Sequence, residues 1–379
     1  MTSEYAPPTD LYSKIGVKTV IHMTGTSTRY GGTILRPEAK AAMDEASRGL
    51  VEIGELNEKA GQVLASKVGA EAGMITSGAA GALLLQAAAV IAGTDPASVA
   101  RLPDTDGMRN EIIMQRVHRM GYDQCYRAAG ARIVDIGQGS STEPWELEAA
   151  ITDKTAAVSF IVSPGNGGRG LKLDNVLDVA HSHDVPVLVD AASMLPPREN
   201  LFKFIRAGAD MVCYSGGKGI RGPQGTGLLL GRRDLIDAAL ANGSPNPAIG
   251  RSGKVAKEEI MGLLAALDAF LEGDEEAEMA EYRVKCEQFL DQLAEVPGIT
   301  FSIEHDEIVH LIPTAIVKLD RSWRGRSSEE IVEALAEGDP PIYCRAVPVG
   351  EGIVFNPFNP THEEMLIAGD RVRQELLKR

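Results

Sequence analysis

The residue with the clearest chemical potential is Lys218, the one lysine in the glycine-crowded stretch 214–225. It lies between two apolar runs, Ala209–Tyr214 and Thr226–Leu230, which are typical of buried strands. Glycines allow a ligand to approach the backbone closely, and a partly desolvated lysine has a lowered pKa and can form a Schiff base. Taken alone, the stretch also fits an ordinary solvated loop lysine.

Two further features stand at the ends of predicted strands. Asp190 ends the apolar run Pro186–Asp190, where a buried carboxylate needs compensation; a helix cap is the alternative. The loop 77–81 lies between a short strand and a predicted helix at Ala82–Ile91, so it offers backbone N–H groups to a phosphate. Together with Lys218, these features form the minimum set for binding pyridoxal phosphate (PLP).

The elements that position these residues are predicted from apolar periodicity. Seven runs, mostly continuous and apolar, favour a largely parallel sheet with helices on both faces, and ligands bind outside the carboxyl ends of such strands. The runs are Gly73–Thr76, Glu111–Met114, Ala131–Ile136, Ala156–Val162, Pro186–Asp190, Ala209–Tyr214 and Thr226–Gly231. Helical patterns lie at Pro37–Leu50, Glu55–Val68, Ala82–Ile91, Tyr122–Ala129 and Asn175–Ser182.

The pattern changes after Gly250 and predicts a smaller α+β domain. Its helices are expected at Lys254–Glu272, Glu275–Val296 and His362–Leu377, and its short strands at Thr300–Ile303 and Thr314–Leu319. We expect three parts: residues 1–49 as a segment packing with the small domain, 50–250 as the PLP-binding domain, and 251–379 as the small domain. The hinge is expected near Val255.

Composition excludes several classes of protein. A net charge of −15 over 379 residues argues against nucleic-acid binding, which needs clustered Lys and Arg. Four scattered cysteines form no CxxC pair, so neither a disulfide framework nor a zinc site is predicted. The polar N-terminus is unlike a signal peptide, and the most apolar stretch, Ala79–Gly93, is too short to span a bilayer. We expect a cytoplasmic protein that acts on a small molecule.

The motifs around Asp190 and Lys218 resemble those of fold-type I PLP enzymes. The segments 189–193 and 214–224 are similar to those of the selenocysteine synthase (L-seryl-tRNA(Sec) selenium transferase) branch, which carries a Ser-Gly-Asp-Lys…Gly-Gly-Pro-Gln signature. Within that branch, the D-glucosaminate-6-phosphate ammonia-lyase family is the most similar. The resemblance covers nearly the whole chain. It implies a seven-stranded, mostly parallel sheet, a smaller α+β C-terminal domain, and a homodimer or larger homo-oligomer with shared active sites.

The resemblance also implies roles for individual residues. Lys218 would form the Schiff base with PLP and act as the catalytic base, and Asp190 would pair with the pyridine nitrogen. The phosphate would be bound by Ser77, Gly78 and Ala79, with Ser215 as a further donor.

Five more residues are candidates, and four of them have a structural alternative. His118 would stack on the cofactor ring, and Asn166 would bond its phenolic oxygen; both also fit an ordinary histidine and a turn asparagine. Arg345 would grip the substrate carboxylate. Arg29 and Arg251 are candidates for a second anionic group of the substrate, although each also fits a solvated arginine.

The chain departs from selenocysteine synthases in two respects. Gly217 stands where they carry Asp, and the chain begins almost directly at the catalytic fold, which, with the acidic charge, argues against a tRNA substrate. We predict a PLP-dependent lyase that removes a β-substituent and ammonia from a small amino acid or amino-sugar acid to give a 2-keto acid. The alternatives are an aldolase, a racemase, an aminotransferase, or a non-catalytic regulator with the same fold.

Overall fold

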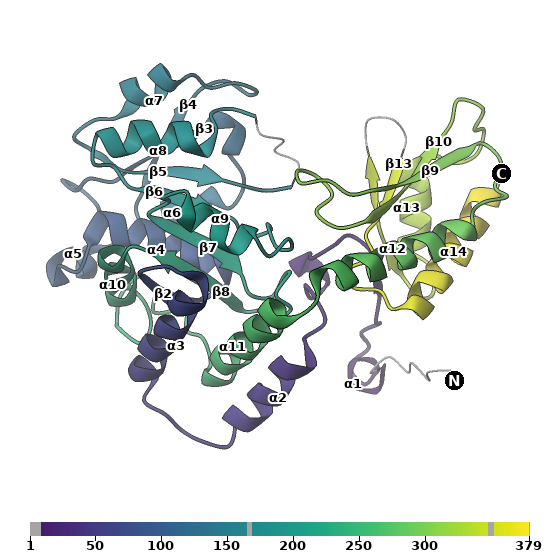
Figure 1. Ribbon diagram of the computed structural model, residues 1–379, viewed down its shortest axis with the longest axis horizontal. Coiled ribbons are helices and arrows are strands. Elements are labelled where there is room, and N and C mark those ends of the chain that lie inside the picture. The colour runs from purple at the N-terminus through teal and green to yellow at the C-terminus, as the bar shows by residue number, and fades with distance from the viewer. Residues whose placement is uncertain (1–8, 165–168, 348–351, 379) are drawn as a thin grey trace. The chain divides into compact units, whose positions relative to one another are not determined.

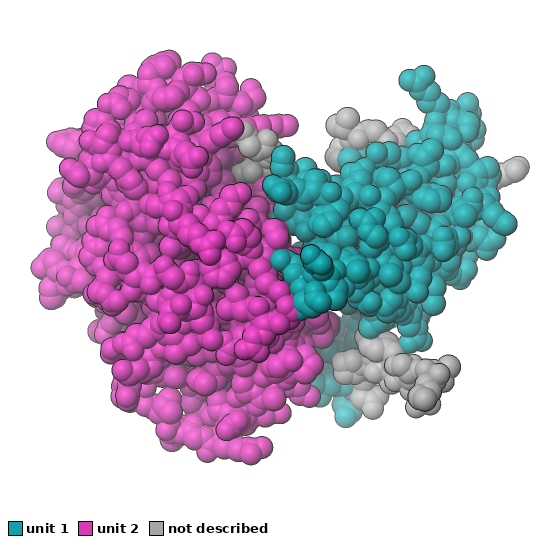
Figure 2. All heavy atoms as spheres, in the orientation of Figure 1, with its two compact units in different colours: residues 1–32, 274–379 teal, residues 33–273 magenta. Residues whose placement is uncertain are grey.

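The computed structural model describes residues 9–164, 169–347 and 352–378 (Figure 1). The chain forms two compact units, which Figure 2 colours separately: residues 33–273, here the large unit, and residues 1–32 with 274–379, here the small unit. These bounds differ from the predicted divisions after residues 49 and 250. Helix α2 (Pro37–Ala46) packs along helix α11 (Lys257–Glu272). This contact makes residues 33–49 and 251–273 part of the large unit.

The large unit contains a seven-stranded sheet of the predicted kind. Its strand order is β2-β8-β7-β6-β5-β3-β4, and every strand except β8 runs parallel to the others. All seven predicted strands are confirmed, at β2 (Ala72–Ser77), β3 (Glu111–Gln115), β4 (Arg132–Ile136), β5 (Thr155–Ile161), β6 (Val187–Asp190), β7 (Met211–Ser215) and β8 (Thr226–Gly231).

Several of the candidate site residues predicted from the sequence for the large unit lie at one edge of this sheet. The parallel strands β2, β3, β5, β6 and β7 end there, and the antiparallel β8 begins there, since Ser77 pairs with Thr226 and Ser215 with Gly227. We call this side of the sheet the carboxyl edge. It is where open α/β sheets bind their ligands.

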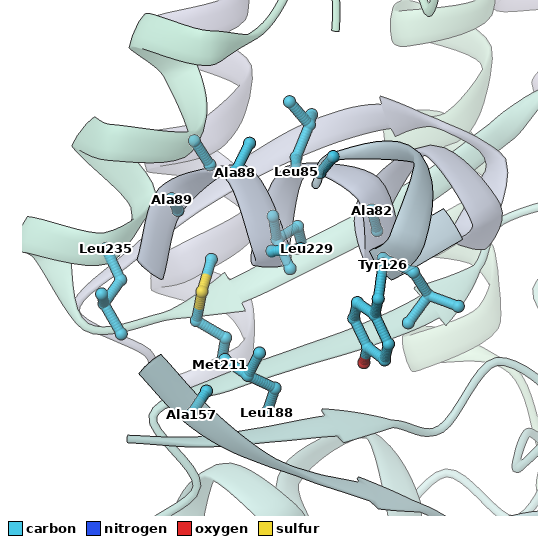
Figure 3. Packing of buried hydrophobic residues seen from close by; sticks show 14 of the residues in the cluster. Ala82, Leu85, Ala88, Ala89, Tyr126, Ala157, Leu188, Met211, Leu229 and Leu235 are labelled. Atoms are coloured by element: carbon cyan, nitrogen blue, oxygen red, sulfur yellow. The ribbon is translucent and has the colours of Figure 1, made fainter. Parts of the chain in front are cut away.

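The core of the large unit is built around helix α4 (Gly78–Ala92), which lies across the sheet (Figure 3). Small alanines such as Ala82, Ala88 and Ala89 let the helix approach Leu188, Met211 and Leu229 of the strands closely. Strand side chains alternate between faces, so Met211 and Cys213 face α4 while Tyr214 points the other way, where its hydroxyl donates to Asn200 O of α9 at 2.8 Å.

Helices therefore cover both faces of the sheet, as predicted. The remaining helices of the large unit are α3 (Ile53–Val68), α5 (Pro96–Arg101), α6 (Asp123–Ala128), α7 (Pro144–Ala150), α8 (Leu173–Ser182), α9 (Asn200–Arg206) and α10 (Arg233–Asn242), with the 3-10 turn η2 (Arg116–His118). No helix in the described part of the chain combines the length and apolarity that a membrane span requires.

The small unit has its own sheet and core. An antiparallel sheet in the order β12-β13-β10-β9 packs beneath helices α12, α13 and α14, and a separate parallel pair joins β1 to β11. The bounds are β1 (Ile21–His22), β9 (Ile299–Glu304), β10 (Thr314–Leu319), β11 (Ile342–Tyr343), β12 (Arg345–Val347), β13 (Gly352–Phe355), α1 (Thr9–Ser13), η1 (Thr28–Tyr30), α12 (Glu275–Asp291), α13 (Ser328–Ala336) and α14 (His362–Leu377).

Gly61 offers a test of the packing between α3 and the sheet. A Cβ atom at Gly61 would lie 2.0 Å from the carbonyl oxygen of Gly73 in β2, so the helix and strand meet backbone to backbone. We expect Gly61→Ala to lower the free energy of unfolding by about 1–3 kcal/mol or more, because backbone cannot move as a side chain can. Urea denaturation would measure it. Gly121→Ala, with no atom within 4 Å of the added Cβ, is the matched control and should change little.

Candidate active site

Four of the predicted residues gather at the carboxyl edge, each just after or at the end of a different strand. Ser77 ends β2, His118 follows β3, Asp190 ends β6, and Lys218 follows β7. Strands β6 and β7 are neighbours, with Asp190 in register with Cys213. Lys218 and Asp190 are close enough for each charge to shift the pKa of the other.

The loop that carries Lys218 is closed by its own backbone. Gly216 N donates to Thr226 O at 2.9 Å, and Gly222 N donates to Gly216 O at 2.9 Å. Burial lowers the pKa of the Lys218 amine, and the negative charge of Asp190 partly opposes that shift. A larger share of the lysine is therefore neutral than in water, which is the form that acts as a nucleophile or base.

Two glycines of this loop are required by close packing. A Cβ atom at Gly219 would lie 2.2 Å from Leu195 O, and one at Gly217 would lie 2.5 Å from the Cα of Gln224. No side chain fits at position 217 without moving the backbone at Gln224. This is a physical reason why glycine stands at this position.

Asp190 is buried, with only 5% of its surface exposed. Its Oδ1 accepts a hydrogen bond from Ala192 N at 3.0 Å and a weaker one from the Cys213 thiol at 3.7 Å. Burial raises the pKa of this carboxyl, and the Ala192 N–H and then the positive charge of Lys218 oppose the rise. A carboxyl held in this way is poised to face a cationic partner, because such a partner would supply the missing compensation.

Cys213 is a site residue that the sequence analysis missed. It lies within a continuous apolar run, where a cysteine reads as core. The useful signal was its register: Asp190 and Cys213 lie at the same level on neighbouring parallel strands and face the same side, toward α4.

Behind Asp190, three buried polar side chains form a chain of hydrogen bonds. Ser159 of β5 donates to the Tyr126 hydroxyl at 3.3 Å, and Tyr126 donates to Gln86 Oε1 of α4 at 3.1 Å. Burial is the largest cause that raises the pKa of Tyr126 far above its usual value, and the charge of Asp190 adds to it. This fixed layer keeps α4, α6 and β5 in register behind the carboxylate.

The predicted phosphate loop is in fact the start of a helix. Residues 77–81 were expected to form a loop before a helix at Ala82, but α4 already begins at Gly78 with Ser77 as its N-cap. The alanines that follow are strong helix formers, so the helix extends back to the strand. Ser77, Gly78 and Ala79 are thus brought together, and the first turn carries N–H groups that have no partner within the helix.

Gly227 of β8 makes room for this helix start. A Cβ atom there would lie 2.4 Å from the carbonyl carbon of Gly78 and 2.7 Å from Ala79 N. The strand backbone therefore lies directly against the first turn, and Thr76 Oγ1 donates to Gly78 O at 2.9 Å to hold it. The result is a closely packed helix N-terminus of the kind that binds anions, and its role in holding a phosphate stays a prediction.

His118 is buried, with 4% of its surface exposed. Ile161 N donates to its Nδ1 at 3.3 Å, and the ring meets Phe160 edge-on with centroids 4.8 Å apart. Burial lowers the pKa of His118 to about 4, so the ring is neutral near pH 7. A neutral flat ring suits stacking, although its stacking role stays a prediction.

The other predicted residues of the large unit lie as follows. Ser215 is the last residue of β7 and is buried. Arg251 is exposed in a turn whose Gly253 approaches Ser77, since a Cβ at Gly253 would lie 3.4 Å from the Ser77 Cβ. The turn that carries Arg251 thus adjoins the helix start. Asn166 lies outside the described residues.

Arg29 and Arg345 belong to the small unit, so their roles stay predictions. The Arg29 guanidinium lies 6.0 Å from the centre of the Tyr30 ring, and Tyr30 stacks on Tyr343 with ring centroids 4.3 Å apart. Arg345 opens β12, two residues after Tyr343, and is exposed. The loop bearing Arg29 therefore contacts the segment that leads into Arg345.

The large-unit residues fit PLP by their chemistry. A buried lysine of lowered pKa, a buried carboxyl of raised pKa and an open helix N-terminus match the aldehyde, ring nitrogen and phosphate of the cofactor. At Gly227 the backbone of β8 packs directly against the backbone of the first turn of α4, so even a methyl group would collide with it.

Comparison with known proteins decides the family. Residues 119–322 match the aminotransferase class-V family, and residues 34–200 match the DegT/DnrJ/EryC1/StrS aminotransferase family. The chain belongs to the aminotransferase class-V family. It is a PLP-dependent enzyme with the fold expected of that family.

Several relatives of this enzyme have assigned activities. It is 32% identical to the D-glucosaminate-6-phosphate ammonia lyase of Salmonella typhimurium, over 96% of this chain and 97% of that protein. It is 33% identical to a 5'-C-glycyluridine monooxygenase-decarboxylase of a Streptomyces species, over 88% of this chain and 84% of that protein. The L-seryl-tRNA(Sec) selenium transferase of Alkaliphilus metalliredigens is 23% identical over 72% of this chain and 60% of its own length.

A solved structure of a D-glucosaminate-6-phosphate ammonia-lyase has the same fold. It superposes with a TM-score of 0.85 at 32% identity, covering 97% of this chain and 98% of that one. The resemblance to this family and to the selenocysteine synthase branch is thereby confirmed.

The buried neutral state of His118 can be tested by pH. Its pKa of about 4 lies below that of an unfolded histidine, about 6.5. The unfolded chain therefore binds more protons between these values, so this contribution to stability is complete above pH 6.5 and is lost as the pH falls toward 4. We expect the NMR ring signals of His118 to stay constant from pH 8 to 5. A midpoint near 6.5 would show the ring to be solvated.

His118→Gln supplies the matched variant for the same prediction. Its side-chain oxygen can still accept from Ile161 N, but it does not titrate. The variant should therefore lose less free energy of unfolding than the wild type between pH 7 and 5, measured by urea denaturation at each pH.

Proposed function

We propose that this enzyme is an ammonia-lyase that converts a 2-amino-3-hydroxy sugar acid of the D-glucosaminate 6-phosphate type into a 2-keto acid and ammonia. The observation that carries the proposal is the pairing of a buried lysine and a buried carboxyl on adjacent strand ends. The full-length similarity to a lyase with that substrate supports it.

Pyridoxal phosphate, when bound, supplies a sink for the negative charge that develops at the substrate's α-carbon. Asp190 would face the ring nitrogen, and a buried carboxylate there would favour its protonated form by charge pairing. Ser77 and the first turn of α4, with Gly78 and Ala79, would hold the phosphate, and Ser215 lies at the same edge to support it. His118, buried and neutral, would stack on the ring.

Lys218 carries the proton transfers. Its lowered pKa leaves a neutral amine that removes the α-proton and then returns a proton as the β-hydroxyl leaves as water. The resulting enamine takes up water, and its hydrolysis gives the 2-keto acid and ammonia. No net oxidation occurs, so no electron acceptor is needed.

We further propose that arginines set the substrate's orientation. Arg345 grips the carboxylate, because a guanidinium matches its two oxygens. Arg251, in the turn beside the helix start, and Arg29 are the candidates for the phosphate of the substrate. The proposal includes a cytoplasmic homodimer or larger homo-oligomer with shared active sites, as the fold-type I resemblance implies.

The deciding experiment is keto-acid release from D-glucosaminate 6-phosphate, with PLP present and no keto-acid acceptor added. We expect equal amounts of keto acid and ammonia. A spectral change of the cofactor without keto acid would instead favour aldol cleavage, racemisation or transamination from the same residues. Neither product nor spectral change would leave only the cofactor and fold in place.

The monooxygenase-decarboxylase relative supplies a second candidate outcome. It is distinguished by running the assay in an oxygen electrode with a 5'-glycyl nucleoside as the alternative substrate. Oxygen uptake with release of carbon dioxide would transfer the assignment to that chemistry, whereas the lyase reaction consumes no oxygen.

The assignment of the lysine has its own test. Lys218→Ala should abolish the visible absorbance of the bound cofactor and lower the rate by at least about 100-fold, since it removes both the covalent anchor and the base. Lys203→Ala, at an exposed position of α9, is the matched control. Survival of the visible band in Lys218→Ala would show that another lysine is the anchor.

A further inference from the structure

A short segment outside the predicted site contacts the lysine loop directly. Residues 33–36, which we call the strap, lie between the glycine-rich segment that begins at Thr24 and helix α2, and they lie 180 positions or more from the loop in sequence. The strap is the first stretch of the large unit, to which the loop also belongs.

The strap and the loop are joined by reciprocal hydrogen bonds to backbone carbonyls. The Thr33 hydroxyl donates to Gly217 O at 3.0 Å and lies 3.4 Å from Lys218 O. Arg36 Nε donates to Ile220 O at 3.0 Å, and its backbone N donates to Arg221 O at 2.9 Å. In return, Arg221 Nε donates to Ile34 O at 3.0 Å.

These contacts act on the peptide groups on both sides of Lys218. The carbonyls of Gly217 and Lys218 flank its Cα, so the Thr33 hydroxyl fixes the direction in which the lysine side chain leaves the backbone. Lys218 O also accepts from Arg221 N at 2.9 Å, which closes the turn on the other side.

The conformation of Arg221 indicates that the contact between the strap and the loop is specific rather than incidental. Arg221 has φ +59°, a left-handed conformation that non-glycine residues seldom adopt. Its side chain and its carbonyl both engage the strap, and these bonds hold the residue in that conformation.

The strap is itself anchored to rigid elements. The Arg36 guanidinium lies 6.0 Å from the centre of the Phe270 ring of α11, and Pro37 begins α2, which packs along α11. The same helix reaches the loop, because a Cβ at Gly262 would contact both Met43 of α2 and Pro223. The lysine loop is therefore held on one side by the strap and on another by α11.

We propose that Thr33 and Arg36 are positioning residues for Lys218, which orient its amine toward the cofactor by holding the carbonyls of the loop. This inference rests on the proposed function, because it takes Lys218 to be the cofactor-binding lysine. It assigns a role to a segment that carries no reactive group of its own.

The test compares Thr33→Val with Thr33→Ser in the cofactor-loaded enzyme. Valine keeps the shape and loses the hydroxyl, whereas serine keeps the hydroxyl. The first measurement is the pH midpoint of the cofactor's visible band, and the second is the dissociation constant of PLP by equilibrium dialysis. We expect Thr33→Val to weaken PLP binding roughly fivefold, the value of one hydrogen bond, and to shift the midpoint. Thr33→Ser should stay within about twofold of wild type.

Two further variants make the result decisive. Arg36→Lys keeps the charge and the backbone hydrogen bond but loses the Nε donor. It should therefore shift the pH midpoint of the visible band in the same direction as Thr33→Val, and it replaces that variant if Thr33→Val does not fold. Lys40→Ala, an exposed side chain one turn further along α2, is the control and should match wild type. Wild-type values for Thr33→Val and Arg36→Lys in both measurements would overturn the proposal, as would equal defects in Thr33→Val and Thr33→Ser.

The proposed function fails in a different way. If Lys218→Ala kept the visible band, the lysine assignment itself would be lost. If the wild-type enzyme has a normal visible band and normal keto-acid release while Thr33→Val is unaffected, only the role of the strap is disproved.

Discussion

The desolvation of one lysine and one carboxyl at the same edge of a sheet is the constraint on which the rest of the structure depends. Burial pushes the pKa of Asp190 up and that of Lys218 down, and each charge partly relieves the other. Such a pair costs folding energy unless something occupies the space with complementary groups. A cofactor with a cationic ring nitrogen, an aldehyde and a phosphate supplies those groups. Its binding therefore offsets the unfavourable burial of Asp190 and Lys218.

The surrounding structure holds this pair by backbone and by packing rather than by further charges. Gly219 and Gly227 allow main chain to meet main chain at distances that exclude any side chain. The thiol of Cys213, from the neighbouring strand β7, and the N–H of Ala192, in the turn after β6, fix the carboxyl. A buried layer of Gln86, Tyr126 and Ser159 lies behind it without adding charge. Rigid neutral surroundings preserve the two shifted pKa values, whereas extra charges would cancel them.

The sheet could be predicted from the sequence, as could the placement of Lys218 and Asp190 at one of its edges, and the reason is local. Continuous apolar runs identify buried parallel strands; Asp190 ends one such run, and Lys218 lies in the loop that follows another. The sequence was insufficient where the first or last residue of an element depends on contacts with distant parts of the chain. The start of α4 at Gly78, and not at Ala82, depends on a glycine of β8 about 150 positions away. The bounds of the large unit depend on α2 packing along α11, which no local pattern predicts.

Cys213 and Thr33 illustrate a further limit, because their residue types carry no signal of chemistry. Each acts on a reactive residue through one hydrogen bond made across strands or across 184 positions of chain. Only the register of β6 with β7, and the path of the strap, bring them there. The identity of the reactive groups is therefore encoded in short motifs, whereas their orientation is encoded in distant contacts. Relatives that share the lysine and the aspartate can for this reason differ in the reaction they catalyse: with the same charge sink in place, the bond that breaks is set by how the amine and the substrate are held.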